Sequence, residues 1–440
     1  MFPVSATEQP VQTLLSGLAG GVIGGNYFGG QAGHANIFTL DIGGTSCDVG
    51  LVRDGHQAYA SEFQLGFGLP ISVPCVDIST IGAGGGSVGW IDKGGFLQVG
   101  PHSAGASPGP AAYGKGGTEA TVTDANLVLG YLNPSYFLGG RMSLSEDRAN
   151  QAIQPLGEKL GISTMEAAES IRRVVNENMA NALRLVAVNR GVDPREFALV
   201  AFGGAGPVHA VAVAEALRIP RVLIPPHPGH CSAFGALIAD WRVDKVQTRL
   251  YRSDTLEATT LDREFQQLTT TALEELCSEG FQGTPIVLRS IDMRYQGQNY
   301  EQEVSIESGV ISEYALKKAL ANFADMHEAF SGSAHPDAVI ELVNLRVTAV
   351  GPSPRIELGK LSTGKTVQPV GHRPVYFSRG GLVETAIYRR AELLGGCRLN
   401  GPVIVEEMSS TTVVPVDYTL TVDHYGLINI FTEEAADEGD

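Results

Sequence analysis

The 440-residue sequence lacks several patterns that would assign a protein class directly. Its five cysteines lie far apart and form no CxxC pair, which is typical of a reducing compartment such as the cytoplasm and not of a disulfide framework. No GxxxxGK[ST] sequence occurs, which excludes a Walker A loop. The glycine-rich stretch TIGAGGGSVGWID, residues 80–92, continues into a segment with strand character and not into a helix. This order argues against a Rossmann dinucleotide site.

Positive charge is also scarce. The formal net charge is −17 and no basic run occurs, so we expect neither nucleic acid nor an anionic membrane as a partner. The apolar stretch 13–25 has no basic residue before it, since the first is Arg53, and we expect no secretory signal there. The uncharged stretch 197–214 contains glycine, proline and histidine, and it predicts no membrane span.

The two halves of the sequence differ in glycine content and in the pattern of their apolar residues. Residues 1–245 are rich in glycine and contain continuous apolar runs such as NIFTLDI and FALVAF. Such runs are typical of strands that are buried on both faces with helices on each side, as in an α/β fold. Residues 246–440 instead contain amphipathic helical spacing and alternating strands. They predict a second domain of α+β or mostly β type, with a boundary between residues 245 and 246.

Several elements can be placed along the chain. Ser163 and Glu166 form a capping box, apolar residues follow at helical spacing, and Gly191 is placed to end that helix. Residues 197–217 read as a strand, a GGAGP turn and an apolar helix. In the second half we expect amphipathic helices over 261–276 and 316–330 and a hairpin over 291–306.

The sequence DIGGTSCD, residues 41–48, has the residue types of a phosphate site. Gly43 and Gly44 allow the backbone N–H groups to approach a phosphate closely, and Thr45 adds a hydroxyl donor. Asp41 and Asp48 repel phosphate, but they can hold Mg²⁺ through water or orient an attacking water. The alternative is a tight hairpin whose glycines serve only turn geometry, and spacing alone gives both readings equal weight.

A second glycine-rich turn lies between the predicted strand and helix of residues 197–217. Gly203, Gly204 and Gly206 precede the helix, and a helix N-terminus favours an anion or a flat nucleotide group against its backbone. Many α/β turns contain glycine, so this motif is weak alone. The glycine- and proline-rich segment 99–126 is either a functional loop or a rigid surface excursion.

His227 and His230 lie three residues apart beside Cys231, which resembles metal-ligand spacing. Pro226 and Pro228 make this segment a loop, and no second ligand cluster accompanies it. We therefore expect no metal site at these histidines, and no base is placed to activate Cys231 as a nucleophile.

Taken together and in order, these segments resemble the hydantoinase/oxoprolinase A-type family. The resemblance is carried by LLSGLAGGVIGG, LDIGGTSCDVGLV, IGAGGGSVGWID, DPREFALVAFGGAGPVHA, IDMRYQGQNYE and GPVIVEEMSSTTVVP, among others, and it runs nearly end to end. Members of the family are ATP-dependent enzymes that act on cyclic amides such as 5-oxoproline and hydantoins, and relatives serve as ketone carboxylase subunits.

The resemblance implies a lobe of the actin/sugar-kinase/heat-shock-ATPase fold over residues 1–245 and a C-terminal α+β domain over 246–440. It implies that ATP and Mg²⁺ are cofactors, and that carbonyl-oxygen phosphorylation drives the opening of a cyclic amide. DIGGTSCD is similar to the second phosphate loop and GGAGP to the loop near the adenosine. A B-type subunit is the implied partner in a cytoplasmic hetero-oligomer. The residues so implied are Asp41 and Asp48 for catalysis, Asp41 for Mg²⁺ through water, and Gly43, Gly44, Thr45, Gly203, Gly204 and Gly206 for the nucleotide.

The sequence also departs from the family pattern. Members usually carry a further DxGGT loop upstream, and the first 37 residues contain none, so we expect the N-terminal phosphate lobe to be absent and activity to depend on a partner. Cys47 stands where threonine is usual, which removes a strong hydroxyl donor. The alternatives are a non-catalytic truncated assembly subunit, a subunit of an ATP-dependent ketone carboxylase, and a small-molecule kinase of the same superfold.

Overall fold

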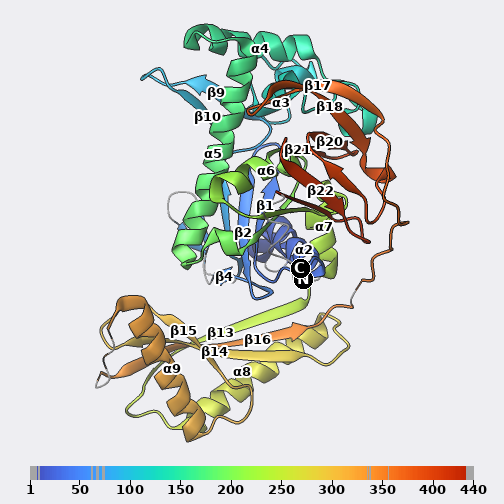
Figure 1. The fold of residues 1–440 in the computed structure, drawn as a ribbon. Coiled ribbons are helices and arrows are strands. Elements are labelled where there is room, and N and C mark those ends of the chain that lie inside the picture. The colour runs from blue at the N-terminus through green and yellow to red at the C-terminus, as the bar shows by residue number, and fades with distance from the viewer. Residues whose placement is uncertain are drawn as a thin grey trace. The chain divides into compact units, whose positions relative to one another are not determined.

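The computed structural model describes residues 7, 10–60, 63–65, 69–71, 75–333, 335, 338–354 and 356–432. The chain forms two compact units, and each consists of two chain segments. The large unit comprises Leu15–Leu237 and Ile356–Asp440, and the small unit comprises Met1–Leu14 and Ile238–Arg355 (Figure 1). The sequence led us to expect a single boundary between residues 245 and 246, whereas each unit of the structure is made of two separate chain segments. The physical reason is strand pairing, because β23 (Ile428–Thr432) pairs with β12 (Arg221–Ile224) in the sheet of the large unit.

The large unit is built on a nine-stranded sheet with the order β19-β22-β23-β12-β11-β1-β2-β3, in which β8 also pairs with β2. Its centre is formed by β1 (Ile37–Ile42), β11 (Ala198–Phe202) and β12, which run parallel. β2 (Cys47–Arg53) returns antiparallel to β1. The other strands are β3 (His56–Gln57), β8 (Ile78–Ile81), β19 (Arg398–Asn400) and β22 (Tyr418–Val422).

Helices cover both faces of this sheet. α2 (Ser16–Gln31) and α7 (Cys231–Ile238) share one hydrophobic cluster with the sheet, and α5 (Thr164–Arg190) and α6 (Gly206–Leu217) share the other. Alternate residues of β1 point into opposite clusters, so the strand is buried on both sides. The prediction of an α/β layer with continuous apolar strands is confirmed (Figure 1).

The predicted helix after Ser163 is confirmed as α5. The Ser163 hydroxyl accepts from the Glu166 amide, the Glu166 carboxylate accepts from Ser163 in return, and Gly191 ends the helix in the left-handed conformation. One face of α5 carries fully buried apolar side chains, including Ile171 and Met179, against the sheet.

The remaining elements of the large unit form smaller layers. A four-stranded sheet has the order β17-β18-β20-β21, and β9 pairs with β10, which confirms the strand predicted after the glycine run. The elements are α3 (Val122–Val128), α4 (Glu146–Leu160), β4 (Tyr59–Ala60), β5 (Phe63–Leu65), β6 (Leu69–Ile71), β7 (Cys75–Val76), β9 (Ser87–Ile91), β10 (Leu97–Ser103), β17 (Gly371–Phe377), β18 (Gly381–Arg389), β20 (Val403–Glu406) and β21 (Thr411–Val414).

The small unit has a four-stranded antiparallel sheet of order β13-β16-β14-β15. Both predicted amphipathic helices and the predicted hairpin β14–β15 are confirmed, and the helices pack their apolar faces on this sheet. The elements are β13 (Trp241–Arg252), α8 (Ala258–Ser278), β14 (Ile286–Tyr295), β15 (Gln302–Ile306), α9 (Glu313–Ser331) and β16 (Ile340–Gly351).

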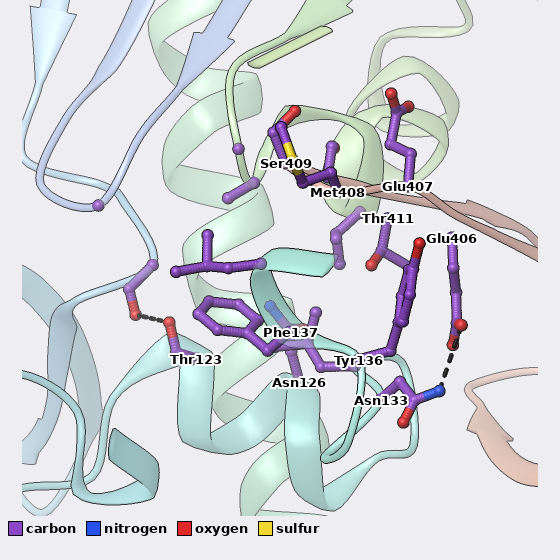
Figure 2. A pocket seen from close by; sticks show the side chains of 18 of the residues that line it. Thr123, Asn126, Asn133, Tyr136, Phe137, Glu406, Glu407, Met408, Ser409 and Thr411 are labelled. Atoms are coloured by element: carbon purple, nitrogen blue, oxygen red, sulfur yellow. Dashed lines mark hydrogen bonds between the residues drawn. The ribbon is translucent and has the colours of Figure 1, made fainter. Parts of the chain in front are cut away.

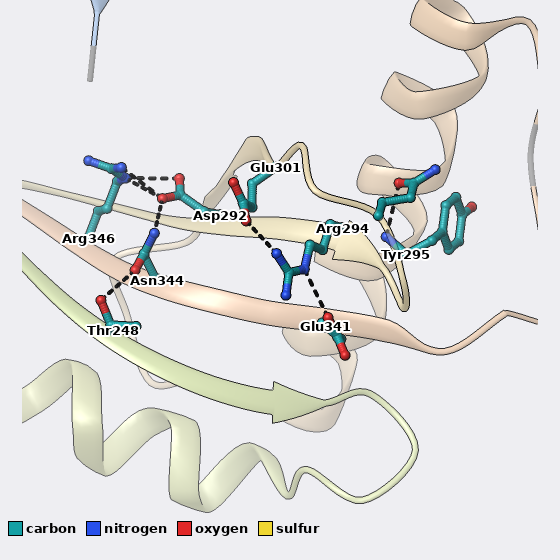
Figure 3. A network of polar contacts seen from close by, with 9 residues as sticks. Thr248, Asp292, Arg294, Tyr295, Glu301, Glu341, Asn344 and Arg346 are labelled. Carbon is teal, nitrogen blue, oxygen red and sulfur yellow. Dashed lines mark hydrogen bonds and ion pairs between the residues drawn. The ribbon is translucent and has the colours of Figure 1, made fainter. Parts of the chain in front are cut away.

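A network of ion pairs lies on the opposite face of the small unit's sheet. Asp292 accepts hydrogen bonds from Arg346 and Asn344, and Arg294 pairs with Glu301 and Glu341 (Figure 3). Ile291 points to the helices, and successive residues of a strand point to opposite faces. Asp292 therefore points to the helix-free face, where it meets its hydrogen-bond partners. Over the part of the chain that the structure describes, no helix is both long and apolar enough to cross a membrane.

Candidate functional site

The turn between β1 and β2 exposes backbone. The Gly43 amide donates to the Ser46 carbonyl oxygen over 3.2 Å, which closes the turn. A Cβ atom added at Gly43 or Gly44 would meet nothing within 4 Å, so the outer side of the turn is open. Both glycines line a pocket of the large unit.

The turn between β11 and α6 lies against this first turn. The Ala205 amide donates to the Ile42 carbonyl oxygen over 2.9 Å, and Gly204 lines the same pocket. Gly203 has a φ of +81° and faces Asp41, whereas Gly206 is buried in the first turn of α6. The structure therefore brings Gly43, Gly44 and Gly204 to one pocket, and Gly203 and Gly206 are not among its lining residues.

The pocket has a volume of about 270 Å³ and combines bare backbone with aromatic and polar side chains. Figure 2 shows Tyr136 and Phe137 among the lining side chains, between Thr123 and the segment that joins β20 to β21. The lining residues are Gly43, Gly44, Gly85, Tyr113, Thr123, Asn126, Leu132, Asn133, Tyr136, Phe137, Leu138, Gly204, Ala205, Val208, Glu406, Glu407, Met408, Ser409, Ser410 and Thr411.

The two predicted acids face each other across the β1–β2 pair. Asp41 Oδ2 accepts from the Ser232 hydroxyl over 2.9 Å. Burial raises the pKa of Asp41, the Ser232 hydrogen bond opposes this, and the charge of Asp48 adds to it. Asp48 accepts from the hydroxyls of Thr80 at 2.6 Å and Ser46 at 3.1 Å. Neither acid lines the pocket, and Thr45 lies outside the lining as well.

The glycine run of residues 84–86 supports the β1–β2 turn through backbone contacts. The Gly85 amide donates to the Gly43 carbonyl oxygen over 3.0 Å, and the Gly86 amide donates to that of Gly44 over 2.6 Å. A Cβ atom at Gly84 would lie 2.7 Å from the Thr45 nitrogen, so only glycine fits there. The run TIGAGGG is therefore a platform for the first turn, a role to which its three consecutive glycines could have pointed.

The glycine- and proline-rich segment 99–126 folds into a wall of the pocket. Its end forms α3, where the Thr123 hydroxyl donates to the Gly85 carbonyl oxygen over 2.8 Å (Figure 2). Buried Asp124 accepts from the amides of Ala111, Ala112 and Thr121, which fixes the path of the segment. The arrangement favours a functional loop over a surface excursion.

The sequence analysis assigned no role to residues 406–411, which are the last residue of β20, the connection 407–410 and the first residue of β21. Glu406 is only 2% exposed and pairs with Arg373 and Arg389. Glu407 Oε1 and Ser410 Oγ are buried without a hydrogen-bond partner. Burial raises the pKa of Glu407 to about 7, and the positive charge of Arg390 opposes that rise. The polar run EEMSSTT between apolar VIV and VVP was the available signal, because such a run between two buried strands marks an exposed or functional turn.

The segment around His227 and His230 forms a 3₁₀ turn, Pro228–His230, followed by α7. Burial raises the pKa of the Cys231 thiol. Across the described ranges of the chain, no group of three or more His, Cys, Asp or Glu side chains could hold a metal ion.

Comparison with known proteins gives two family matches. The model of the Hydantoinase/oxoprolinase family matches residues 1–245, and that of the Hydantoinase/oxoprolinase C-terminal domain matches residues 251–432. An uncharacterised protein of Methanocaldococcus jannaschii is 40% identical over 97% of this chain and 63% of its own length. Caprolactamase subunit alpha of Pseudomonas jessenii is 35% identical over 94% of this chain and 61% of its own length.

Solved structures resemble the chain closely. The crystal structure of ATP-dependent caprolactamase from Pseudomonas jessenii has a TM-score of 0.83 at 34% identity, covering 94% of this chain and 61% of that one. A nucleotide-free structure of acetone carboxylase, an enzyme of ATP-dependent acetone carboxylation, has a TM-score of 0.77 at 27% identity. The match covers 94% of this chain and 60% of that one. The predicted fold of the actin-like ATPase type is thereby confirmed. The chain spans about three fifths of the length of these two relatives.

Proposed function

Because the chain belongs to the hydantoinase/oxoprolinase family, we propose that the pocket of its large unit binds ATP for chemistry on a cyclic amide. The observation that carries this proposal is the convergence of Gly43, Gly44 and Gly204, from turns far apart in the sequence, on one pocket. Bare backbone in two facing turns gives a phosphate group room to approach, and a side chain at either turn would remove that room.

The pocket residues fit a nucleotide on three counts. The open turns suit phosphate, and Gly204 precedes the N-terminus of α6, where backbone N–H groups favour an anion. Tyr136 and Phe137 offer apolar ring faces. Asn126 and Ser410 add polar side chains to the lining, and each carries a buried oxygen without a hydrogen-bond partner.

Asp41 suits a Mg²⁺ ion held through water. Asp41 is the penultimate residue of β1, one residue before the turn, and the Ser232 hydroxyl donates to one of its carboxylate oxygens. Mg²⁺ keeps several waters and needs only one or two carboxylates, so Asp41 with Asp48 suffices. Thr45, Gly203 and Gly206 then act indirectly, by shaping the two turns.

ATP, when bound, supplies the phosphoryl group that makes an amide oxygen a better leaving group. In this proposal the chain holds the phosphates at Gly43 and Gly44 and orients water near Asp41. The aromatic side chains of the pocket lining, Tyr136 and Phe137, exclude bulk water. We propose that the chain is an A-type subunit, or part of one, that opens a cyclic amide together with a B-type subunit. The likeness to caprolactamase subunit alpha supports this activity.

A second candidate is a subunit of an ATP-dependent ketone carboxylase, which the similarity to acetone carboxylase favours. Both candidates use the same nucleotide site. We also propose the cytoplasm as the compartment, because all five cysteines are free.

The test is isothermal titration of Mg-ATP into the 440-residue chain, alone and with a B-type subunit, followed by phosphate release. We expect saturable ATP binding, and ATP hydrolysis that 5-oxoproline stimulates. Stimulation by acetone with bicarbonate, and not by cyclic amides, would select the carboxylase candidate. Absence of ATP binding both with and without the B-type subunit contradicts the proposal.

A further inference from the structure

The sheet of the small unit ends in a strand with an open outer edge. β15 is the last strand in the order β13-β16-β14-β15, and within the described residues it pairs with β14 alone. In an antiparallel edge strand, every second residue directs its backbone N–H and C=O groups away from the sheet. Besides the β14 ladder, no backbone hydrogen bond reaches residues 302–306 from the described part of the chain. The edge therefore offers hydrogen-bond donors and acceptors to an added strand.

A groove of about 250 Å³ lies at this edge. Ser305 and Ile306 of β15 both line it, and so does Glu307 directly after them. Successive residues of a strand point to opposite faces of the sheet, so a groove that touches both Ser305 and Ile306 meets the strand from its edge.

One face of α9 forms the other side of the groove (Figure 1). The lining residues Ala315, Lys318, Ala319 and Asn322 recur at helical spacing. Ala315 and Ala319 are 6% and 2% exposed, and Ile306 across the groove is 7% exposed. Their apolar surface forms the floor, and the two methyl groups leave room for the side chains of a further segment.

The open edge is acidic on the side that faces away from the helices. Residues 301–307 include three glutamates and no basic residue. Exposed Glu303, Ser305 and Glu307 alternate with buried Val304 and Ile306, which face the helices. Basic side chains of an added strand would therefore lie beside acids.

The same charges disfavour a second copy of this strand as the occupant. Symmetric antiparallel pairing of β15 with itself would bring glutamates opposite glutamates, which is destabilising. The Glu307–Lys318 ion pair leaves both side chains at least half exposed, so it contributes little and a basic side chain can replace Lys318 as the partner of Glu307.

We propose that the edge of β15 docks an extended segment of a partner protein, in which basic and small apolar residues alternate. The basic side chains lie beside Glu303 and Glu307, and the apolar side chains lie in the groove over Ala315 and Ala319. Main-chain hydrogen bonds supply affinity in such strand addition, and the groove and the charges supply specificity. This docking surface belongs to the small unit and is independent of ATP binding.

The experiment titrates the 440-residue chain into a fluorescent peptide, Lys-Val-Lys-Val-Lys-Val, and follows the anisotropy. We expect saturable binding. It should weaken about tenfold or more for Glu-Val-Glu-Val-Glu-Val, because acids then lie beside acids, and for the basic peptide with methylated backbone nitrogens, because that peptide cannot donate main-chain hydrogen bonds. Equal binding of the methylated and unmethylated peptides contradicts strand addition. Absence of saturable binding contradicts the docking surface.

The position of the peptide is tested with Asn322→Arg. Asn322 is exposed and lines the groove, so an arginine there fills the groove and repels the basic peptide without entering the core. We expect an affinity loss of about tenfold or more. Ala321→Arg is the matched control, because this neighbouring exposed residue of α9 lies outside the groove lining and the change adds the same charge. Equal affinities of the two variants contradict the site.

Sedimentation velocity of the chain without peptide distinguishes a partner protein from a second copy. We expect the wild type and Asn322→Arg to sediment alike, because the edge binds a basic strand of another protein. Self-association of the wild type that Asn322→Arg abolishes would assign the edge to a second copy and overturn the proposal.

Discussion

Gly203 lies so close to Asp41 that no other residue fits its place. A Cβ atom at Gly203 would overlap Oδ1 of Asp41 and the carbonyl oxygen of Ile42. The two residues lie at the same ends of neighbouring parallel strands, because Asp41 pairs in register with Phe202, the last residue of β11, and Gly203 follows it. The glycine thus lets the β11–α6 turn and the acid of the β1–β2 turn meet at one edge of the sheet.

Gly203→Ala should destabilise the chain more than Gly33→Ala. Both glycines have nearly the same positive φ, +81° and +82°, but nothing lies within 4 Å of a Cβ atom at Gly33. Backbone strain of about 1 kcal/mol is therefore common to both changes, and the overlap with Asp41 is specific to Gly203. We expect an extra loss of about 2 kcal/mol or more at Gly203, measured by urea unfolding. Equal losses of unfolding free energy in the two variants would contradict this prediction, because they would mean that the β11–α6 turn shifts to accommodate the methyl group without an energetic cost.

Glu406→Gln should be strongly destabilising. The Glu406 carboxylate, 2% exposed, pairs with Arg373 and Arg389 and accepts from Asn133. Removing its charge leaves two half-buried guanidinium groups without a counter-charge, at a cost of about 3 kcal/mol or more. Glu215→Gln is the control, because its ion pair with Arg379 is exposed and should contribute about 1 kcal/mol or less. Similar unfolding free energies for the two variants would contradict the assigned role of Glu406.

The free energy of unfolding should fall as pH rises through neutrality, because the Glu407 carboxyl group loses its proton in the folded chain. Its pKa is raised from 4.5 to about 7 in the folded chain, so between these values the folded state holds a proton that the unfolded state releases. Its contribution is fully present below the unfolded pKa and is lost as pH rises through about 7. The wild type should lose up to about 3 kcal/mol relative to Glu407→Gln between pH 5 and pH 8, measured by urea unfolding.

The matched control for this titration is Glu357→Gln, which removes an acid from an exposed position of the same unit. Its unfolding free energy should follow that of the wild type across the pH range. A Glu407→Gln curve parallel to the wild type would show that this carboxyl group titrates normally.

Local signals in the sequence predicted much of the fold. The helix α5 could be placed because Ser163, Glu166 and Gly191 are neighbours of the helix that they cap and end. The central strands could be recognised as buried on both faces because their apolar runs are continuous. The discontinuous large unit could not be predicted, because the pairing of β23 with β12 joins segments that are remote in the sequence.

The candidate site was predictable only in part, for the same reason. Glycines 43, 44 and 204 stand out as turn residues, but spacing cannot tell that Gly204 faces the pocket while Gly206 packs in α6. Asn126 and Glu407 reach the pocket from an unrelated helix and an unrelated strand connection. Their roles depend on burial and on unpaired atoms, which only the folded structure reveals.

The binding of ATP at the open β1–β2 turn is the central claim, and Gly44→Ala tests it most directly. A methyl group at Gly44 meets nothing in the folded chain, so the melting temperature should stay unchanged, while the affinity for Mg-ATP should fall about tenfold or more because the methyl group fills the phosphate space. Gly371→Ala, at an equally open glycine outside the pocket, should leave both values unchanged. If titration gives Gly44→Ala the same ATP affinity as Gly371→Ala, the nucleotide does not bind at this turn and the account is contradicted.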